Sequence, residues 1–434
     1  MSRKSNLIES DFYQETQLAD GPLVISHAMP EAQSVAIGIF VDVGSRDEEA
    51  HQAGVSHALE HMVFKGTRTL GVHELAEKLD DLGGNANAFT SRERTCFHLH
   101  VLHEAWREAL SLLTDMVLEP ALPEAEWLRE REVIYAEMGM VEDTPEEWVM
   151  DQHVSALFSG NALGRPVLGY HETLDALSAE DLKGYLQKWY RPPRLLVAAA
   201  GRIEHKQLVQ MLGERIAHKS WAHGSELPAR TLAGEGESGL QSLVRKGEQA
   251  QIVASFPGIT VASDERPLAW LGNQMLGGGM SSRLFREVRE RRGLAYSVGS
   301  HLNMLSDTGS WSITCGMEPD RGSECIAVMA DVLEGFSASL SLDEVERAKR
   351  QLEVQFRMGL DSVEGQMLYL GSRLDEKSLI LPLQWVDRIR GVDARDVQKW
   401  AGRHLSQDAL WTVAAPEGAL VSICAKIHDR VHPC

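Results

Sequence analysis

The sequence predicts an α+β fold of two homologous domains, each a mostly antiparallel sheet packed with helices. The chain has 434 residues, more than one hydrophobic core usually serves, so two domains are expected. Stretches with a strand pattern and stretches with a helix pattern occur in both halves. The second half repeats the element order of the first, which indicates two copies of one α+β unit.

The first half opens with strands and continues into helices. Apolar runs and alternating patterns predict strands at 23–29, 35–44 and 95–102 and directly after Pro193. Apolar residues spaced three to four apart predict helices at 55–65, 73–82, 104–118 and 123–140. Lys65 and Gly66 are typical of a helix C-terminus, so the helix at 55–65 is expected to end there.

A stretch rich in Gly, Ala, Ser and Glu separates the two halves. It has no hydrophobic periodicity, which is typical of an interdomain linker. We therefore expect a first domain at 1–222, a linker at 223–240 and a second domain at 241–434. The patterns in the second half predict, in order, a strand at 250–258, helices at 267–276 and 283–293, strands at 295–304 and 309–317, and helices from about 321 to 357.

Composition and charge exclude several classes of protein. No apolar run approaches the ~20 residues of a bilayer span, so no membrane insertion is expected. The net charge of −20 opposes binding to nucleic acid and to anionic membranes, while it favours basic peptides. Five cysteines without a C-x-x-C pair argue against a disulfide framework, and the N-terminal stretch lacks a secretory or transit pattern. These features predict a cytoplasmic protein.

The HALEH segment at 57–61 is the first candidate for chemistry. His57 and His61 are four residues apart, so a helix stacks both imidazoles on one face, where they can bind one cation. Glu60 is next to the second histidine. Its carboxylate can therefore reach a water at the metal's open coordination position and act as general base without being a ligand.

A catalytic zinc site needs a third protein ligand, and the segment at 126–143 offers one. Glu130 and Glu137 are seven residues apart and share a helix face with Ile134. Acidic residues on an inward face are also found in salt bridges to a buried arginine. The spacing alone leaves both interpretations open.

Several segments taken together carry a resemblance. GSRDE, HALEHMVFKGT, NANAFTSRERT, EREVIYAEM and GGGMSSRLFREVRERRGLAYSV resemble the pitrilysin-type inverzincin zinc peptidases, in the branch of the mitochondrial processing peptidase β subunit and its bacterial homologues. The likeness covers nearly the whole chain, in order. It implies one zinc ion per chain, with His57 and His61 as ligands, Glu60 as base and Glu137 as third ligand. It also implies that Glu130 orients the site.

The resemblance further implies where a substrate binds. The strand around Asn87, Ala88 and Phe89 corresponds to an edge against which a peptide lies as an added β-strand. Arg289 and Tyr296 correspond to an Arg and Tyr pair in which the tyrosine donates to the scissile carbonyl.

These observations predict a zinc endopeptidase that hydrolyses peptides, unfolded proteins or presequence-like extended segments. The alternative is a noncatalytic scaffold or core subunit of the same fold, because the family also contains such members. Longer single-chain members of the family use four repeats to enclose a chamber. For this chain, with two repeats, the resemblance therefore implies a homodimer in which Arg289 and Tyr296 of one chain complete the zinc site of the other.

Overall fold

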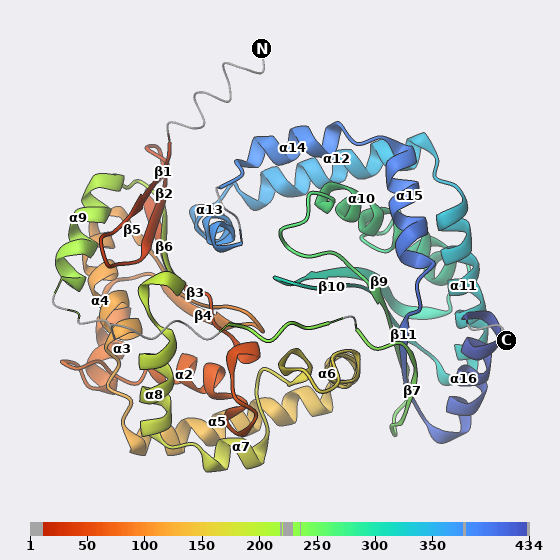
Figure 1. Cartoon of the computed structure of the whole chain (residues 1–434), viewed down its shortest axis with the longest axis horizontal. Helices are drawn as coiled ribbons and strands as arrows, with labels where there is room; N and C mark the ends of the chain where they lie inside the picture. Colours follow the sequence, from red (N-terminus) through yellow and green to blue (C-terminus); the bar gives the residue numbers. More distant parts are fainter. Residues whose placement is uncertain (1–11, 218, 220–228, 235, 376–378, 432–434) are drawn as a thin grey trace. The chain divides into compact units, whose positions relative to one another are not determined.

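The computed structural model describes residues 12–217, 219, 229–234, 236–375 and 379–431 (Figure 1). The predicted linker at 223–240 therefore lies partly outside the described residues. Among the described residues, no helix combines the length and the apolar character needed to cross a bilayer.

The chain divides into two compact units that interleave along the sequence. The first unit comprises Met1–Met138, Arg165–Thr231 and Arg357–Leu381, and the second comprises Gly139–Gly164, Leu232–Phe356 and Pro382–Cys434. Each half of the sequence thus contributes one segment to the unit that the other half mainly builds. The boundaries at 222 and 241 follow chain order only, and they remain a prediction.

The first unit contains a six-stranded sheet, antiparallel except between β2 and β6. Its strands, from one edge to the other, are β1 (Tyr13–Gln17), β2 (Leu23–Ala28), β6 (Leu195–Gly201), β3 (Ser34–Val41), β5 (Thr95–Leu102) and β4 (Asn85–Thr90). The predicted strands at 23–29, 35–44 and 95–102 and after Pro193 are confirmed. The sheet ends at β4, which pairs only with β5 among the described strands.

The second unit contains a five-stranded sheet with the same connectivity. Its strands, in order across the sheet, are β7 (Gly239–Val244), β11 (Leu410–Ala415), β8 (Ala250–Pro257), β10 (Gly309–Met317) and β9 (Ala295–Met304). When β1 is left out, the first sheet has the matching order β2, β6, β3, β5 and β4. In each sheet the first pair of this five-strand order, β2 with β6 or β7 with β11, is parallel, and the remaining pairs are antiparallel. The shared order confirms the predicted α+β fold of two homologous domains.

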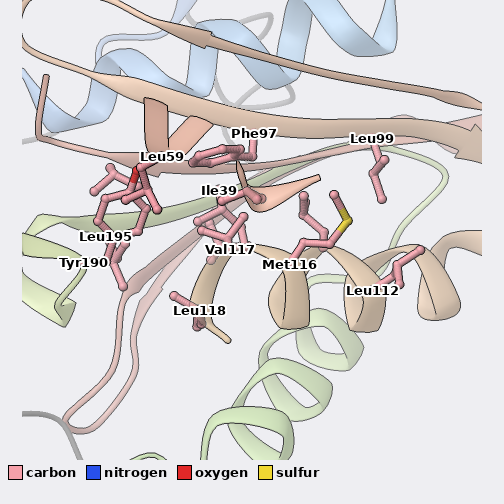
Figure 2. Close-up of a cluster of buried hydrophobic side chains, with 14 of the residues drawn as sticks. Ile39, Leu59, Phe97, Leu99, Leu112, Met116, Val117, Leu118, Tyr190 and Leu195 are labelled. Atoms are coloured by element: carbon pink, nitrogen blue, oxygen red, sulfur yellow. The ribbon is translucent and has the colours of Figure 1, made fainter. Parts of the chain in front are cut away.

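Helices cover both faces of the first sheet. On one face, Leu59 of α2 (Val55–Val63) and Met116 of α4 (Trp106–Leu118) join Phe97 of β5 in a buried cluster (Figure 2). On the other face, α13 (Val363–Leu370) packs Met367 against Phe40 of β3. The central strands are therefore buried on both sides, and β3 accordingly has a continuous apolar sequence instead of an alternating one.

The second sheet is enclosed in a similar way. Its larger core lies under α10 (Arg266–Leu276), α11 (Gly322–Ala338) and α15 (Ala394–Leu405), where Trp311, Trp400 and Phe336 are buried. Val149 of α6 (Pro145–Leu157) packs on the opposite face. The remaining longer helices are α3 (Val72–Asp81), α5 (Glu124–Asp143), α7 (His171–Ala176), α8 (Ala179–Trp189), α9 (His205–Ile216), α12 (Leu342–Gly359), α14 (Pro382–Arg390) and α16 (Glu417–Val431).

The predicted helices in the first half and at 267–276 are confirmed to within a few residues. The segment predicted as a helix at 283–293 differs, because Phe285–Glu290 forms a π-helical turn. A π-helix bonds each N–H to the fifth preceding carbonyl, and Arg291 N donates to Arg286 O at 2.9 Å in that way.

Candidate metal centre

Helix α2 presents three polar side chains on the face away from the core. Val55, Ala58, Leu59 and Met62 are buried, while His57, Glu60 and His61 are only half-buried. The N-terminus of the helix is held by a buried acid, since the two carboxylate oxygens of Glu48 accept the N–H groups of Gly54 and Ser56, both at 2.8 Å. This arrangement satisfies backbone donors that a helix start leaves unpaired.

Helix α5 supplies the acidic residues opposite α2. Trp127, Glu130, Ile134 and Met138 are the buried residues of this helix, and Glu137 is half-buried beside them. The predicted helix face with Ile134 is therefore present. It carries Glu130 toward the protein interior and Glu137 toward the histidines.

The structure brings His57, His61 and Glu137 together. Glu137 Oε2 lies 3.7 Å from His57 Nε2 and 3.6 Å from His61 Nε2, and one ligand atom from each residue lies within 4.8 Å of the others. Tetrahedral zinc with bonds near 2.1 Å separates its ligand atoms by about 3.4 Å. The three side chains thus fit a zinc ion, and of the described residues only these form such a group.

Glu130 contacts this group from behind. Its Oε2 lies 3.2 Å from His61 Nδ1 and its Oε1 lies 2.7 Å from Lys65 Nζ. A carboxylate at Nδ1 fixes the tautomer that leaves Nε2 free for a metal. Glu130 therefore forms a salt bridge, as one of the two sequence interpretations allowed, but its partner is Lys65, just after the end of α2, and not an arginine. Lys65 was predicted only as part of a helix end, and no sequence pattern indicated its contact with Glu130.

Burial sets the protonation of the first histidine. It lowers the pKa of His57 to about 4, and the neighbouring His61 acts in the same direction. His57 is therefore neutral near pH 7, which is the form that binds a metal. The two imidazole rings have centroids 4.6 Å apart, as expected for histidines one turn apart on a helix.

Glu60 lies beside the histidines but outside the ligand group. Burial raises the pKa of Glu60, while a hydrogen bond from Thr90 and the proximity of His61 oppose the rise. Thr90 Oγ1 donates that bond to Glu60 Oε2. No sequence pattern indicated a role for Thr90, although this residue ends the strand that the resemblance connects with substrate.

That strand is β4, an edge of the first sheet. Asn87 and Phe89 are exposed, whereas Ala88 is half-buried and packs against the core cluster that includes α2. Along its inner edge β4 pairs residue by residue with β5, for example Asn87 with His98. No described strand pairs with its outer edge. The three residues predicted to contact substrate thus lie on a strand that can accept another strand.

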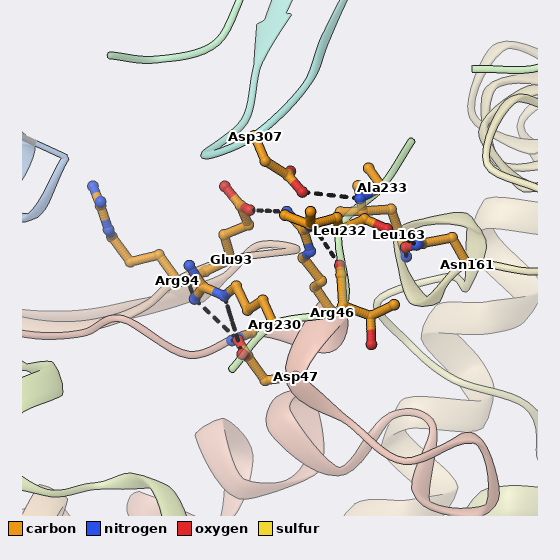
Figure 3. A network of polar contacts seen from close by, with 12 residues as sticks. Arg46, Asp47, Glu93, Arg94, Asn161, Leu163, Arg230, Leu232, Ala233 and Asp307 are labelled. Atoms are coloured by element: carbon orange, nitrogen blue, oxygen red, sulfur yellow. Dashed lines mark hydrogen bonds and ion pairs between the residues drawn. The ribbon is translucent and has the colours of Figure 1, made fainter. Parts of the chain in front are cut away.

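The ion pairs in Figure 3 fix the backbone on the approach to α2. Arg230 Nε lies 3.0 Å from Asp47 Oδ1. Its Nη2 also lies 3.1 Å from Asp42 Oδ1. Arg46 Nη1 contacts Glu93 Oε1 at 2.5 Å. Arg46 and Asp47 belong to the GSRDE segment. The charges of Arg46 and Asp47 are therefore explained by contacts with the turn that follows β4 and with Arg230, which lies within the predicted linker.

Arg289 and Tyr296 lie in the second unit. The guanidinium carbon of Arg289, at the π-helical turn, is 5.6 Å from the centre of the Tyr296 ring. Tyr296 is 75% exposed near the start of β9, which is the edge strand of the second sheet. The predicted site residues therefore form two groups, the metal-binding group of the first unit and this pair in the second.

Two family profiles and several sequence relatives match most of the chain. The insulinase (peptidase family M16) profile matches residues 23–170, and the peptidase M16 inactive domain profile matches residues 176–352. The uncharacterized zinc protease YmxG of Bacillus subtilis is 33% identical over 418 residues, covering 93% of this chain and 98% of the relative. An uncharacterized zinc protease of Mycobacterium tuberculosis is 34% identical over 423 residues, covering 96% of each chain.

Two solved structures share the fold. A peptidase M16 inactive domain from Pseudomonas fluorescens has a TM-score of 0.86 at 20% identity, over 93% of this chain and 98% of that chain. A protease from Helicobacter pylori has a TM-score of 0.86 at 17% identity, over 93% and 99%. At these identities the structures support the fold alone. The sequence relatives and the family profiles decide the membership, and the chain belongs to the insulinase family of zinc metalloproteases, peptidase family M16.

Proposed function

We propose that the chain is a zinc-dependent endopeptidase that hydrolyses peptides or presequence-like extended segments, with one zinc ion per chain. The observation that carries the proposal is the convergence of His57, His61 and Glu137. Beside them lies Glu60, in contact with Thr90 at the end of the edge strand β4. A zinc ion held there supplies Lewis-acid polarisation of a carbonyl and makes a water molecule more acidic.

Within this proposal, each side chain has a distinct task. Glu60 accepts the proton of the attacking water, because its carboxylate adjoins the ligand group without being part of it. Glu130 holds His61 Nδ1 and so keeps Nε2 directed at the metal. Lys65 pairs with the second oxygen of Glu130, which keeps that carboxylate in place.

The outer edge of β4 supports the assignment of substrate class. A peptide added there would be held by main-chain hydrogen bonds, which require an extended backbone and do not require a particular side chain. The exposed side chains of Asn87 and Phe89 flank that edge. The net charge of −20 favours basic peptides among extended substrates. The cysteine content supports a cytoplasmic location.

The proposed roles of Arg289 and Tyr296 depend on a homodimer. We infer that the second domain of one chain presents this pair to the metal site of the other chain, where Tyr296 donates to the developing oxyanion. The high exposure of Tyr296 supports this role, because an exposed phenol is available to a second chain. The dimer then contains two shared sites.

The experiment that tests the function is the Glu60→Gln variant. Glutamine keeps the shape of the side chain but cannot accept the proton, so peptide hydrolysis should fall by a factor on the order of 100 or more. The zinc content, measured by atomic emission, should remain near one ion per chain. Near wild-type turnover by a zinc-loaded variant would remove Glu60 from the role of base.

Zinc content distinguishes the proposed peptidase from the alternative, a noncatalytic scaffold. A noncatalytic subunit has no need of a stoichiometric ion, whereas the proposed peptidase should bind about one zinc per chain and lose it on His57→Ala. A wild-type protein that binds no zinc and cleaves no peptide in a mixed peptide library would favour the scaffold.

A further inference from the structure

Thr90 contacts Glu60 directly. Its hydroxyl donates to Glu60 Oε2, and among the described residues no other hydrogen bond to the Glu60 carboxylate is present. Both side chains are half-buried. One carboxylate oxygen is therefore occupied, and Oε1 is left for a water molecule. Thr90 is also the last residue of β4, so the contact joins the edge strand to the helix that carries the metal ligands.

The position of Thr90 is fixed from both sides. Toward the sheet, it pairs with Thr95 in the β4–β5 register. Toward the turn, Ser91 O accepts Ser45 N at 3.2 Å, and Arg92 O accepts Arg46 N at 2.8 Å. A side chain at Gly44 would place its Cβ 2.2 Å from Ser91 O, so this close approach requires glycine.

The polar network shown in Figure 3 also holds the turn that follows Thr90. Arg230 Nη2 donates to Glu93 O at 2.9 Å while its other contacts hold Asp47. Threonine is β-branched and therefore stiff about its first side-chain torsion. The hydroxyl of Thr90 is consequently a fixed donor, in contrast to the flexible glutamate that it contacts.

We propose that Thr90 is a positioning residue that holds the Glu60 carboxylate in the orientation required of a general base. The inference rests on the proposed function, because it assigns no reaction of its own. A free glutamate side chain samples several rotamers, and a hydrogen bond to its ionised carboxylate selects one of them. Because Thr90 belongs to β4, a peptide bound along that strand and the base beside it share one rigid support.

The test compares Thr90→Val, which keeps the shape and removes the hydroxyl, with Thr90→Ser, which keeps the hydroxyl. Each variant is assayed as the zinc-loaded full chain on a fluorogenic peptide. For Thr90→Val, kcat should fall between about tenfold and a hundredfold, as expected for loss of a hydrogen bond to a charged group. KM and zinc content should stay within about twofold. Thr90→Ser should recover most of kcat.

A structural readout accompanies the kinetics. Crystal structures of the zinc-loaded proteins should show one position of the Glu60 carboxylate in the wild type and in Thr90→Ser, and more than one in Thr90→Val. The exposed Thr69→Val is the matched control for loss of a threonine hydroxyl, and its kcat should remain unchanged.

Two outcomes would overturn the proposal. One is a Thr90→Val protein with kcat within twofold of wild type. The other is loss of zinc from that variant, which would assign Thr90 to the metal site instead of the base. Both are distinct from failure of the proposed function, which would appear as an active Glu60→Gln protein. If Thr90→Val does not fold, the comparison of Thr90→Ser with Thr90→Ala tests the proposal instead. Only Thr90→Ser should then retain most of the wild-type kcat.

Discussion

At the scale of single residues, Glu130 and Glu137 differ in their surroundings although they lie on the same helix. Glu130 is buried and already has two partners, His61 Nδ1 and Lys65 Nζ. Glu137 is half-buried, and its Oε2 faces the Nε2 atoms of both histidines. The first arrangement suits a residue that orients a ligand, and the second suits a ligand.

We therefore expect the two glutamine variants to differ in metal affinity. Glu137→Gln should weaken zinc binding more, because a neutral amide oxygen is a poorer zinc ligand than a carboxylate. Glu130→Gln should weaken it by about 10- to 100-fold, the usual effect of removing a partner of a ligand. Competition with a chromophoric chelator measures both dissociation constants. Exposed Glu132→Gln on the same helix is the control, and the reverse order of affinities would exchange the two roles.

The sequence could predict the part of this site that depends on helix geometry. The spacing of His57 and His61 requires only that the segment be helical, and the same holds for the shared face of Glu130 and Glu137. The contact between Glu130 and Lys65 could not be predicted in this way, because it joins α5 to the segment after α2, and the spacing does not specify how these pack. For the same reason, no pattern within α2 indicated that Thr90 would reach Glu60.

At the scale of elements, α6 shows that a helix pattern in the sequence does not indicate which sheet the helix packs on. This helix comes from the first half of the chain but packs on β8 and β11 of the second sheet. Its buried His153 contacts Thr412 Oγ1 at 2.9 Å and Ser255 Oγ at 2.7 Å. Thr412 donates its proton to Gln241, so His153 Nδ1 must donate to Thr412 and Nε2 must accept from Ser255. Periodicity predicts that a helix has a buried face, but not which sheet covers it.

This network makes the docking of α6 dependent on pH. Burial lowers the pKa of His153 from 6.5 to about 4, so the unfolded chain binds a proton between these values that the folded chain does not. The contribution of His153 to the free energy of unfolding is therefore fully present above about pH 6.5. It decreases as the pH falls toward 4, by on the order of 3 kcal/mol. His153→Gln removes this titration.

The His153→Gln variant should be less stable than wild type at pH 7.5, because glutamine does not reproduce both hydrogen bonds. The difference in free energy of unfolding between the two proteins should be smaller at pH 5. Denaturant midpoints measured from pH 5 to 8 test this, with exposed His73→Gln as the control that should follow wild type throughout. A difference between His153→Gln and wild type that is the same at both pH values would show that His153 does not titrate in this window.

At the scale of the whole molecule, the two sheets share an order of five strands, but only the first unit carries the candidate metal ligands His57 and His61. The repeat was predictable because each half shows the same succession of strand and helix patterns. The exchange of 139–164 and 357–381 between the units was not predictable, since the sequence of a helix does not specify which sheet it packs on. Arg289 and Tyr296 lie in the second unit, whose described residues include no candidate metal-binding group. A site that uses both groups therefore needs residues from two domains.

Whether those domains belong to one chain or to two is decided by mixing inactive variants. One protein carries Glu60→Gln and the other carries Arg289→Ala with Tyr296→Phe, and the chains are allowed to exchange. If sites are shared between chains, each mixed dimer has one site with both defects and one with none. Random exchange makes half of the dimers mixed, so about a quarter of wild-type activity should return. Exchange is verified by mass spectrometry of differently tagged chains, with a mixture of two Glu60→Gln preparations as the control. If mixed dimers form and activity stays at the level of the separate variants, each site is completed within its own chain or without this pair.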